Sequence, residues 1–279
     1  MIAPTPGHEG HGVEKGTPVD TGDVRQAADR AGDSPIVQWG ARAGYAVSAL
    51  LHLLMGFLGL QLAFGQHSQS VDQSGAVALL SANPFGKALL AASFSALFLL
   101  ALWQLTEVAT RHETKDRLKA LGKGVAYAAL GLTAVGAFLT GQASSSQSTE
   151  DAARTTLSLP GGGLLLVAGG LAVIAIGGYH VWRGVTSSFL KQLVEHPPEF
   201  VVWAGRLGYA AKGVALIATG VLLALAGWRH DADAARGGLD GAFASLLELP
   251  WGTAVLAAIA LGFMGYAVYG FARARLARL

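Results

Sequence analysis

Six apolar segments, each about as long as a bilayer core is thick, constrain this chain more than any other feature of its sequence. A helix needs roughly 20 apolar residues to cross that core. The segments run approximately over Ala43–Phe64, Ala88–Thr106, Lys123–Thr140, Gly161–Trp182, Leu207–Trp228 and Trp251–Ala272. Only 14% of the residues are charged, against roughly 25% in an ordinary soluble domain. The sequence therefore predicts an all-α integral membrane protein with six transmembrane helices.

The chain also repeats itself as three parallel units of two helices each. The residues that follow Arg42, Arg117 and Arg206 align in one register. Three glycines coincide in this alignment: Gly56, Gly131 and Gly220. A proline, which suits the first turn of a helix, precedes each second helix: Pro84, Pro160 and Pro250. The predicted repeats are residues 39–110, 111–190 and 191–279, after a disordered cytoplasmic tail over residues 1–38.

The arrangement of the repeats leaves two alternatives open, a pseudo-threefold bundle and a linear array. Each second helix is expected to end on an aromatic residue: Trp103, Trp182 and Tyr269. The distance from the preceding proline to this aromatic residue is longer in the middle repeat, so the alignment predicts an insertion there.

The outer loops after Gly75 and Gly238 predict short amphipathic helices. These helices either lie at the membrane interface or cap a central cavity.

Lysine and arginine predict the orientation of the chain, because cytoplasmic loops carry an excess of them. With the amino terminus inside, sixteen of the 20 basic residues fall on the inner side. The remaining four are Lys87, Arg154, Arg229 and Arg236. The bias predicts that both termini lie in the cytoplasm.

The repeated pattern resembles a known family. Arg-x-Gly-Tyr-Ala with a following Lys-Gly-Val, a loop, Pro-aromatic-Gly and a closing aromatic is similar to the domain-of-unknown-function family 1206. That family consists of actinobacterial and other bacterial membrane proteins with tandem two-helix repeats. The resemblance covers most of residues 36–275, implies the fold and a plasma (inner) membrane location, and implies no activity. The second repeat departs from the pattern at Lys119 and Ala120.

His52 is the one ionisable residue that the sequence places near the centre of a span. Its counterparts in the other repeats are Tyr127 and Leu216. The favoured interpretation is structural, because a neutral histidine can simply form a hydrogen bond with a neighbouring helix. The functional alternatives are a proton relay, a metal ligand or a quinone contact, since burying an ionisable group is costly.

Five basic residues would form a ring at the inner surface if the repeats pack around an axis: Arg42, Arg117, Arg206, Lys123 and Lys212. Topology and attraction to anionic phospholipid account for them, at about 1 kcal/mol for each cation near such a surface. The functional alternative is an anion-binding vestibule or a docking surface.

Several chemistries lack a sequence signature in this chain. It contains no cysteine, which excludes disulfides and thiolate ligands. Phosphate-binding, zinc-protease and serine-hydrolase motifs are missing. The small net charge of +2 gives no argument for nucleic acid. We therefore expect no catalytic residues, no cofactor and no metal site.

Two functions of different classes remain open at this stage. The first is a non-catalytic accessory or structural protein that associates with a membrane protein partner, because polar residues are scarce in the predicted spans. The second is a small-solute or ion transporter or channel with its path between the repeats and His52 or the basic ring on the route.

Overall fold

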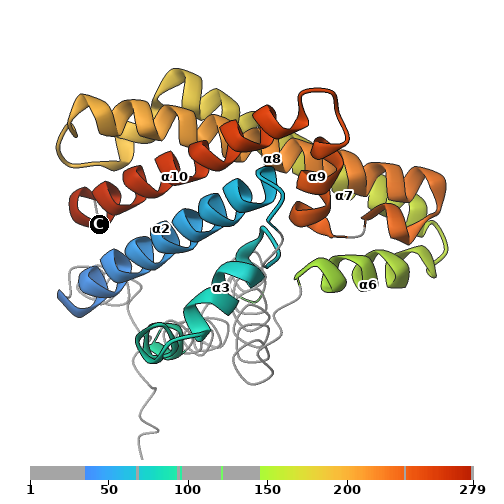
Figure 1. The fold of residues 1–279 in the computed structure, drawn as a ribbon, viewed down its shortest axis with the longest axis horizontal. Helices are drawn as coiled ribbons and strands as arrows, with labels where there is room; N and C mark the ends of the chain where they lie inside the picture. Colours follow the sequence, from blue (N-terminus) through green and yellow to red (C-terminus); the bar gives the residue numbers. More distant parts are fainter. Residues whose placement is uncertain are drawn as a thin grey trace, which may run out of the picture. The chain divides into compact units, whose positions relative to one another are not determined.

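The computed structural model describes residues 35–66, 69–92, 95, 121, 145–235 and 237–277. Gly40–Arg278 forms one compact unit; residues 1–39 with Leu279 form another, of which only the start of the first helix is described. The long helices are α2 (Pro35–Ala63), α7 (Gly162–Thr186), α8 (Glu199–Arg229) and α10 (Gly252–Leu276) (Figure 1). The shorter ones are α3 (Gln73–Ser81), α6 (Ser145–Leu157), α9 (Gly238–Leu247) and the 3-10 helices η1 (Ser188–Gln192) and η2 (Ala232–Ala235).

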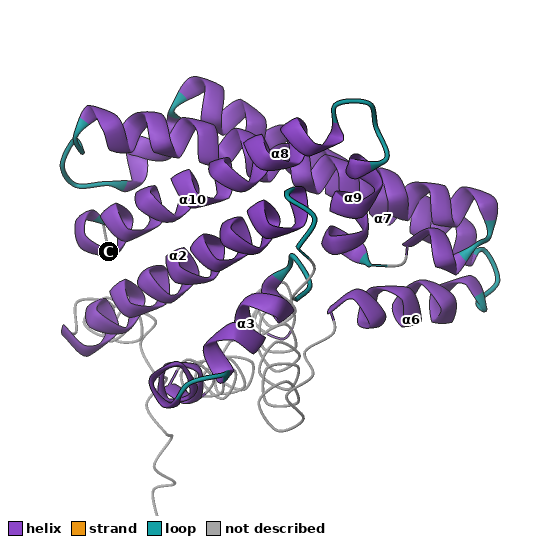
Figure 2. Ribbon diagram, in the orientation of Figure 1, coloured by secondary structure: helices purple, strands orange, loops and turns teal. Residues whose placement is uncertain are grey.

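Helix is the only regular structure in the part of the chain that is described (Figure 2). Residues 84–92 are also helical. An isolated β-bridge joins Leu193 to Ala277. The expected all-α class is thus confirmed for these residues. One boundary differs, since α2 begins at Pro35, inside the segment predicted to be a disordered tail.

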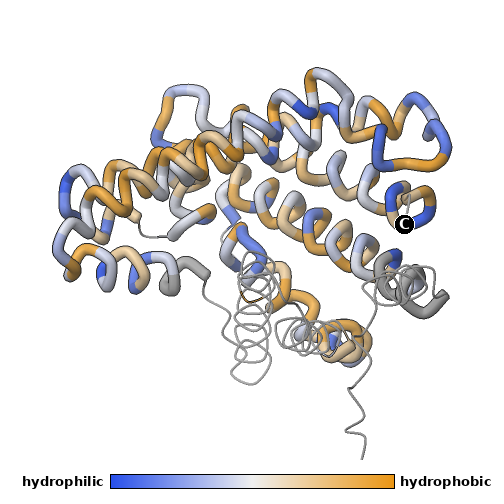
Figure 3. The backbone as a smooth tube through the Cα atoms, turned by 180° about the vertical axis from the view of Figure 1, so that it is seen from behind, coloured by the Kyte–Doolittle hydropathy of each residue, from blue (hydrophilic) through white to orange (hydrophobic). Residues whose placement is uncertain are grey.

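Four of the predicted spans coincide with helices that are long and apolar enough to cross a membrane. They cover Arg42–Ala63, Gly162–Thr186, Glu199–Arg229 and Gly252–Leu276. Hydrophobic residues recur along these helices, while the connections are more hydrophilic (Figure 3). The predicted second and third spans lie outside the described residues, apart from 88–92 and 95. The described residues therefore have the architecture of a helical membrane protein and include four candidate spans.

Exposed aromatic side chains mark both ends of the spans. On α8, Trp203 is 52% exposed and Trp228 is 79% exposed. Trp251, at the start of α10, is also 79% exposed. The helix between the two tryptophans of α8 is about 37 Å long at 1.5 Å per residue, close to the thickness of a bilayer with its interfacial regions. Tryptophan favours those interfaces, so the spacing fits a membrane-spanning helix.

α7 and α8 pack through glycines that recur every seven residues on each helix. They are Gly163, Gly170, Gly177 and Gly184 on α7, and Gly213, Gly220 and Gly227 on α8. A Cβ on Gly177 would lie 2.7 Å from the carbonyl oxygen of Gly213. The two backbones therefore approach so closely that a side chain at these positions would force the helices apart. Such contacts are a common way for helices to associate in lipid.

The first and third repeats also contact each other, through α2 and α10. A Cβ on Gly56 would lie 2.7 Å from the carbonyl oxygen of Ala260, and a Cβ on Gly220 would lie 2.7 Å from that of Gly170. Ala260 and Gly170 are each the tenth residue after the proline of their repeat. The contact that joins the second repeat to the third thus recurs between the third and the first. A linear array, in which only consecutive repeats touch, is excluded.

This match corrects the alignment of the second helices. The equivalence extends to Ile174 and Met264, which lie against Gly220 and Gly56 respectively. Moreover, α7 and α10 both have 25 residues and both begin two residues after the proline. Tyr179, not Trp182, is therefore the counterpart of Tyr269. The predicted insertion is wrong, because two aromatic residues one turn apart allowed the sequence to be aligned on either.

A tight turn of the same construction ends the loop of every repeat. The short helices α3, α6 and α9 each stop three residues before the proline. Two residues after the proline stands a glycine whose Cβ would collide with the carbonyl oxygen six residues earlier: Gly86, Gly162 and Gly252. Two of the three short helices were expected, whereas the polar α6 was not. The prolines lie at Pro84, Pro160 and Pro250, where each second helix begins or is about to begin.

Candidate functional site

A lysine and a histidine from different repeats meet in the interior. Nζ of Lys212 on α8 lies 3.1 Å from Nε2 of His52 on α2. Nδ1 of His52 lies 2.7 Å from the carbonyl oxygen of Ser48. A carbonyl can only accept a hydrogen bond, which assigns the proton to Nδ1 and leaves Nε2 as the acceptor for the ammonium. Since a lysine is ordinarily protonated at neutral pH, this Lys212–His52 pair carries one positive charge.

Aromatic rings enclose the Lys212–His52 pair. The His52 ring lies 4.6 Å from the ring of Tyr266 and 5.9 Å from that of Phe263, centroid to centroid. Nζ of Lys212 lies 4.7 Å from the centroid of the Tyr266 ring, within cation–π range. His52 is only 5% exposed. The charge is thus held in a largely apolar environment contributed by α10.

Lys212 has no carboxylate partner among the residues that the structure describes. Arg154 forms ion pairs with Glu150 and Asp233, and neither of these carboxylates lies in the lining of the pocket. His52 and Tyr266 stabilise the ammonium without neutralising it. An uncompensated charge inside a membrane span is costly and commonly marks a function.

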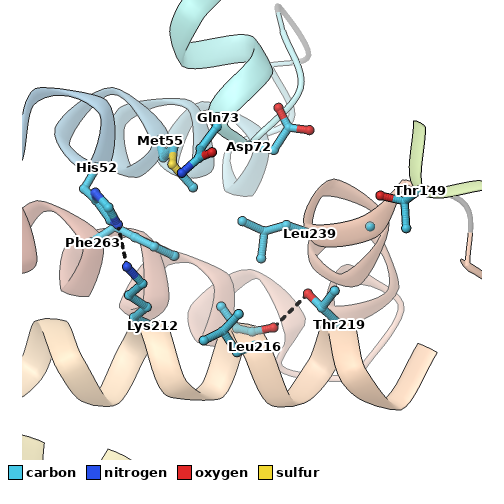
Figure 4. Close-up of a pocket in the computed structure, with 12 residues that line it drawn as sticks. His52, Met55, Asp72, Gln73, Thr149, Lys212, Leu216, Thr219, Leu239 and Phe263 are labelled. Carbon is cyan, nitrogen blue, oxygen red and sulfur yellow. Dashed lines mark hydrogen bonds between the residues drawn. The ribbon is translucent and has the colours of Figure 1, made fainter. Parts of the chain in front are cut away.

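The Lys212–His52 pair lies at one side of a pocket of about 290 Å³. Residues from all three predicted repeats line it, as Figure 4 shows: His52, Met55, Asp72, Gln73, Thr149, Lys212, Ala215, Leu216, Thr219, Gly238, Leu239 and Phe263. Leu216 is the counterpart of His52 in the third repeat. Equivalent positions of the first and third repeats therefore face a common space.

The short helices border the pocket opposite the Lys212–His52 pair. The backbone N–H of Val71 donates to Oδ1 of Asp240 at 2.8 Å, which ties the α3 segment to α9. Thr149 of α6 lies against Gly238 at the start of α9. These contacts support the alternative in which the loop helices cap a cavity.

Charged groups at the outer edge of these helices pair with one another. Arg154 of α6 donates to Glu150 at 2.8 Å and to Asp233 at 3.4 Å. The hydrogen bond and charge of Glu150, with a further contribution from Asp233, raise the pKa of Arg154. Because Arg154 is largely exposed, these bonds orient the loops without adding much to stability.

Tyrosines and a phenylalanine fill the bundle on the other side of the Lys212–His52 pair. Phe189, Tyr209 and Tyr269 are buried against one another, with Phe189 and Tyr209 stacked at 5.0 Å. The Tyr269 hydroxyl donates to the carbonyl oxygen of Phe189 at 3.2 Å. Tyr266 packs on this cluster and on His52. Tyr266 therefore links this aromatic cluster to the Lys212–His52 pair.

The three described members of the predicted basic ring, Arg42, Arg206 and Lys212, contact different partners. Arg42 donates to the carbonyl oxygen of Arg275 at 2.7 Å, and Arg206 lies over the ring of Trp203 at 4.7 Å. Lys212 points instead into the pocket. Arg117 and Lys123 lie outside the described residues, so the ring stays a prediction.

Sequence reasoning found His52 but missed its partner. Lys212 was assigned to the inner surface because Leu207 was taken as the start of the span, whereas α8 begins at Glu199. That earlier start places Lys212 more than three turns inside the helix. The metal-ligand alternative for His52 gains no support, since no cluster of three His, Asp or Glu residues occurs within the described segments.

Apolar helices packed through glycine, together with a turn and an interhelical contact that recur between repeats, define a helical membrane protein built from tandem two-helix units. The family described as Domain of Unknown Function (DUF1206) matches the chain three times, at residues 43–111, 118–187 and 207–277. The chain belongs to this family, as the resemblance implied. The three matches confirm the tandem repeats.

One relative among curated proteins is the "Uncharacterized protein YxxB" of Bacillus subtilis (strain 168). It is 26% identical to this chain over 250 residues, which cover 84% of this chain and 89% of the relative. No solved structure matches the chain.

Proposed function

We propose that this chain is a plasma-membrane transporter or channel that binds a small solute in the pocket between its repeats. The observation that carries the proposal is the Lys212–His52 pair. This charged hydrogen bond lies at one side of a pocket that residues of all three repeats line. Binding sites near the bilayer midplane at repeat interfaces are typical of transporters.

The proposed membrane topology has six spans with both termini in the cytoplasm. The family matches cover the two predicted spans that are not described, and the recurring turn at Gly86 belongs to the first repeat. The excess of Lys and Arg lies at the helix ends that carry Arg42 and Arg206. This bias supports a cytoplasmic location for those ends. Arg42 and Arg206 would there meet anionic phospholipid.

The sequence favoured an accessory or structural protein because polar residues are scarce in the predicted spans. The contact between Lys212 and His52 removes that reason. A membrane protein partner remains the competing proposal, and native mass spectrometry of the gently extracted protein tests it. A stoichiometric partner protein would favour the accessory function.

The direct test is solute flux in proteoliposomes that contain the purified chain. Liposomes are loaded with a mixture of small solutes of each charge, and the loss of each is followed by mass spectrometry. We expect flux of at least one solute, and its loss in His52→Ala. His180→Ala is the matched control, since His180 also bonds a carbonyl four residues earlier, at Ile176, and does not line the pocket. Absence of flux for every solute would contradict the proposal.

A further inference from the structure

We infer that the ligand of the pocket is a small monovalent anion, such as a short-chain carboxylate, and that Lys212 is the group that binds it. This inference rests on the proposed function and names the chemical class of its solute. The charge, the size and the lining of the pocket all support an anionic ligand.

The ammonium of Lys212 needs a negative partner that the described residues do not provide. Its contacts are Nε2 of His52 and the ring of Tyr266, both uncharged. Taking an unpaired charge out of water is expensive, and a counter-charge reduces the cost. An anion in the pocket would supply it. A cationic solute would add a second positive charge at the same place.

Asp72, the acidic residue of the pocket lining, accepts hydrogen bonds from the first turn of α3. Its carboxylate accepts hydrogen bonds from the backbone N–H groups of Ser74 at 2.8 Å and Gly75 at 3.0 Å, and from the Ser74 hydroxyl. It thereby caps α3, where the helix dipole favours negative charge. Asp72 is thus engaged with α3, which leaves one cation in the lining to be matched by one anion.

His52 acts as a positioning residue for Lys212. Because Ser48 fixes the proton on Nδ1, Nε2 presents a lone pair to the ammonium and holds it at the pocket. One of the three ammonium protons is used in this bond, so the others are free to bind a carboxylate oxygen.

The remaining lining fits a ligand that has an apolar part. Met55, Leu216, Leu239 and Phe263 form much of the pocket wall. The volume of about 290 Å³ lies at the lower limit of typical ligand pockets, roughly 300 Å³. A solute of a few carbon atoms with one charged end matches both the size and the lining.

Thiol labelling tests the inference directly, because the chain has no native cysteine. Thr219 lines the pocket and lies two helical turns from Lys212, so Thr219→Cys places a thiol near the charge. The purified full-length variant is treated with a sulfonate-bearing or a trimethylammonium-bearing methanethiosulfonate reagent. The exposed Ser245→Cys on α9 gives the intrinsic ratio of the two rates, and Leu216→Cys provides a second pocket position.

Relative to the Ser245→Cys control, we expect the sulfonate reagent to be favoured about tenfold or more at Thr219→Cys. Adding Lys212→Met should abolish this preference, whereas adding Lys191→Met, at an exposed position, should preserve it. Protection by acetate but not by acetamide would further support a carboxylate ligand.

The labelling experiment distinguishes failure of the anion assignment from failure of the proposed transport function. Equal rates for both reagents, a preference for the cationic one, or a preference that survives Lys212→Met would overturn the anion assignment while leaving a water-accessible pocket. No labelling by either reagent at Thr219→Cys and Leu216→Cys, with normal labelling of Ser245→Cys, would show that solutes do not reach the pocket. That outcome would overturn the inference and the proposed function together.

Discussion

Lys212 donates a hydrogen bond of 3.1 Å to His52 across 160 residues of sequence. The two residues belong to the third and first repeats, and neither has a counterpart of the same type in its partner's repeat, where Ser48 and Leu216 stand instead. The bond therefore breaks the symmetry that the duplicated units would otherwise share. It concentrates the polar chemistry of the described spans at one side of the pocket.

Replacing Lys212 by methionine should stabilise the protein when no solute is bound. The change removes a charge that lacks a counter-ion and keeps the length of the side chain, and such replacements of buried charges can stabilise by about 1–4 kcal/mol. Thermal unfolding of the purified variant measures the effect. Arg206→Met, at a partly exposed position, should change stability by less than about 0.5 kcal/mol. A Lys212→Met protein less stable than its parent would mean that a negative group already pairs with the ammonium.

Gly177→Ala should destabilise the packing of α7 on α8, since its Cβ would lie 2.7 Å from the carbonyl oxygen of Gly213. Overpacking of this kind costs typically 1–3 kcal/mol. The adjacent Gly178 has nothing within 4 Å of the corresponding Cβ position. Gly178→Ala should therefore be neutral or slightly stabilising, by up to about 1 kcal/mol, because alanine is the better helix former. Urea or thermal unfolding compares the pair, and equal effects would refute the close approach of the helices.

A disulfide between Ala49→Cys and Gly270→Cys should form readily and join the first repeat to the third. The Cβ position of Gly270 lies 2.8 Å from Cβ of Ala49, so a slight separation brings the pair to the disulfide distance of about 3.8 Å. Peptide mass spectrometry after mild oxidation detects the link. Ala49→Cys combined with Gly178→Cys is the control pair and should remain reduced. If neither pair cross-links, α2 does not lie against α10 in the membrane.

Asp72→Ala should loosen α3 at the border of the pocket. The substitution removes the acceptor for the backbone N–H groups of Ser74 and Gly75, and loss of such a cap costs roughly 0.5–2 kcal/mol. Asp72→Asn retains an acceptor oxygen and should lose less. Hydrogen exchange of the α3 amides reports the local effect, with the exposed Asp151→Ala as the control. Unchanged exchange in Asp72→Ala would show that the cap does not hold the helix.

The proposed topology predicts opposite labelling of the two loop regions in intact cells. A membrane-impermeant thiol reagent should modify Ser245→Cys, on the side of the short helices. It should modify Lys191→Cys, on the side of the arginines, only after permeabilisation, because basic residues mark the cytoplasmic side. The reverse pattern would invert the orientation, and labelling of both would exclude a span between them.

Much of the architecture could be predicted from the sequence, because it depends on local properties of the chain. Segments of about 20 apolar residues identify spans wherever they stand, and duplication leaves a visible register. Gly56, Gly220 and the three prolines were aligned on these grounds, and the described contacts place them in equivalent surroundings. The polar α6 was missed, since its apolar positions are too few to give a helical period.

The candidate site depended on tertiary structure. Sequence placed His52 within a span, but the distance from Lys212 to His52 is set by the packing of α2 and α8 against α10, which no local pattern encodes. Likewise, the choice between Tyr179 and Trp182 needed the contacts of α7, since residues three apart occupy the same face of a helix. The sequence determined that the chain crosses a membrane in repeated units. Only the tertiary structure decided that two of those units bring one unneutralised charge to a shared pocket, because that depends on contacts between residues far apart in the chain.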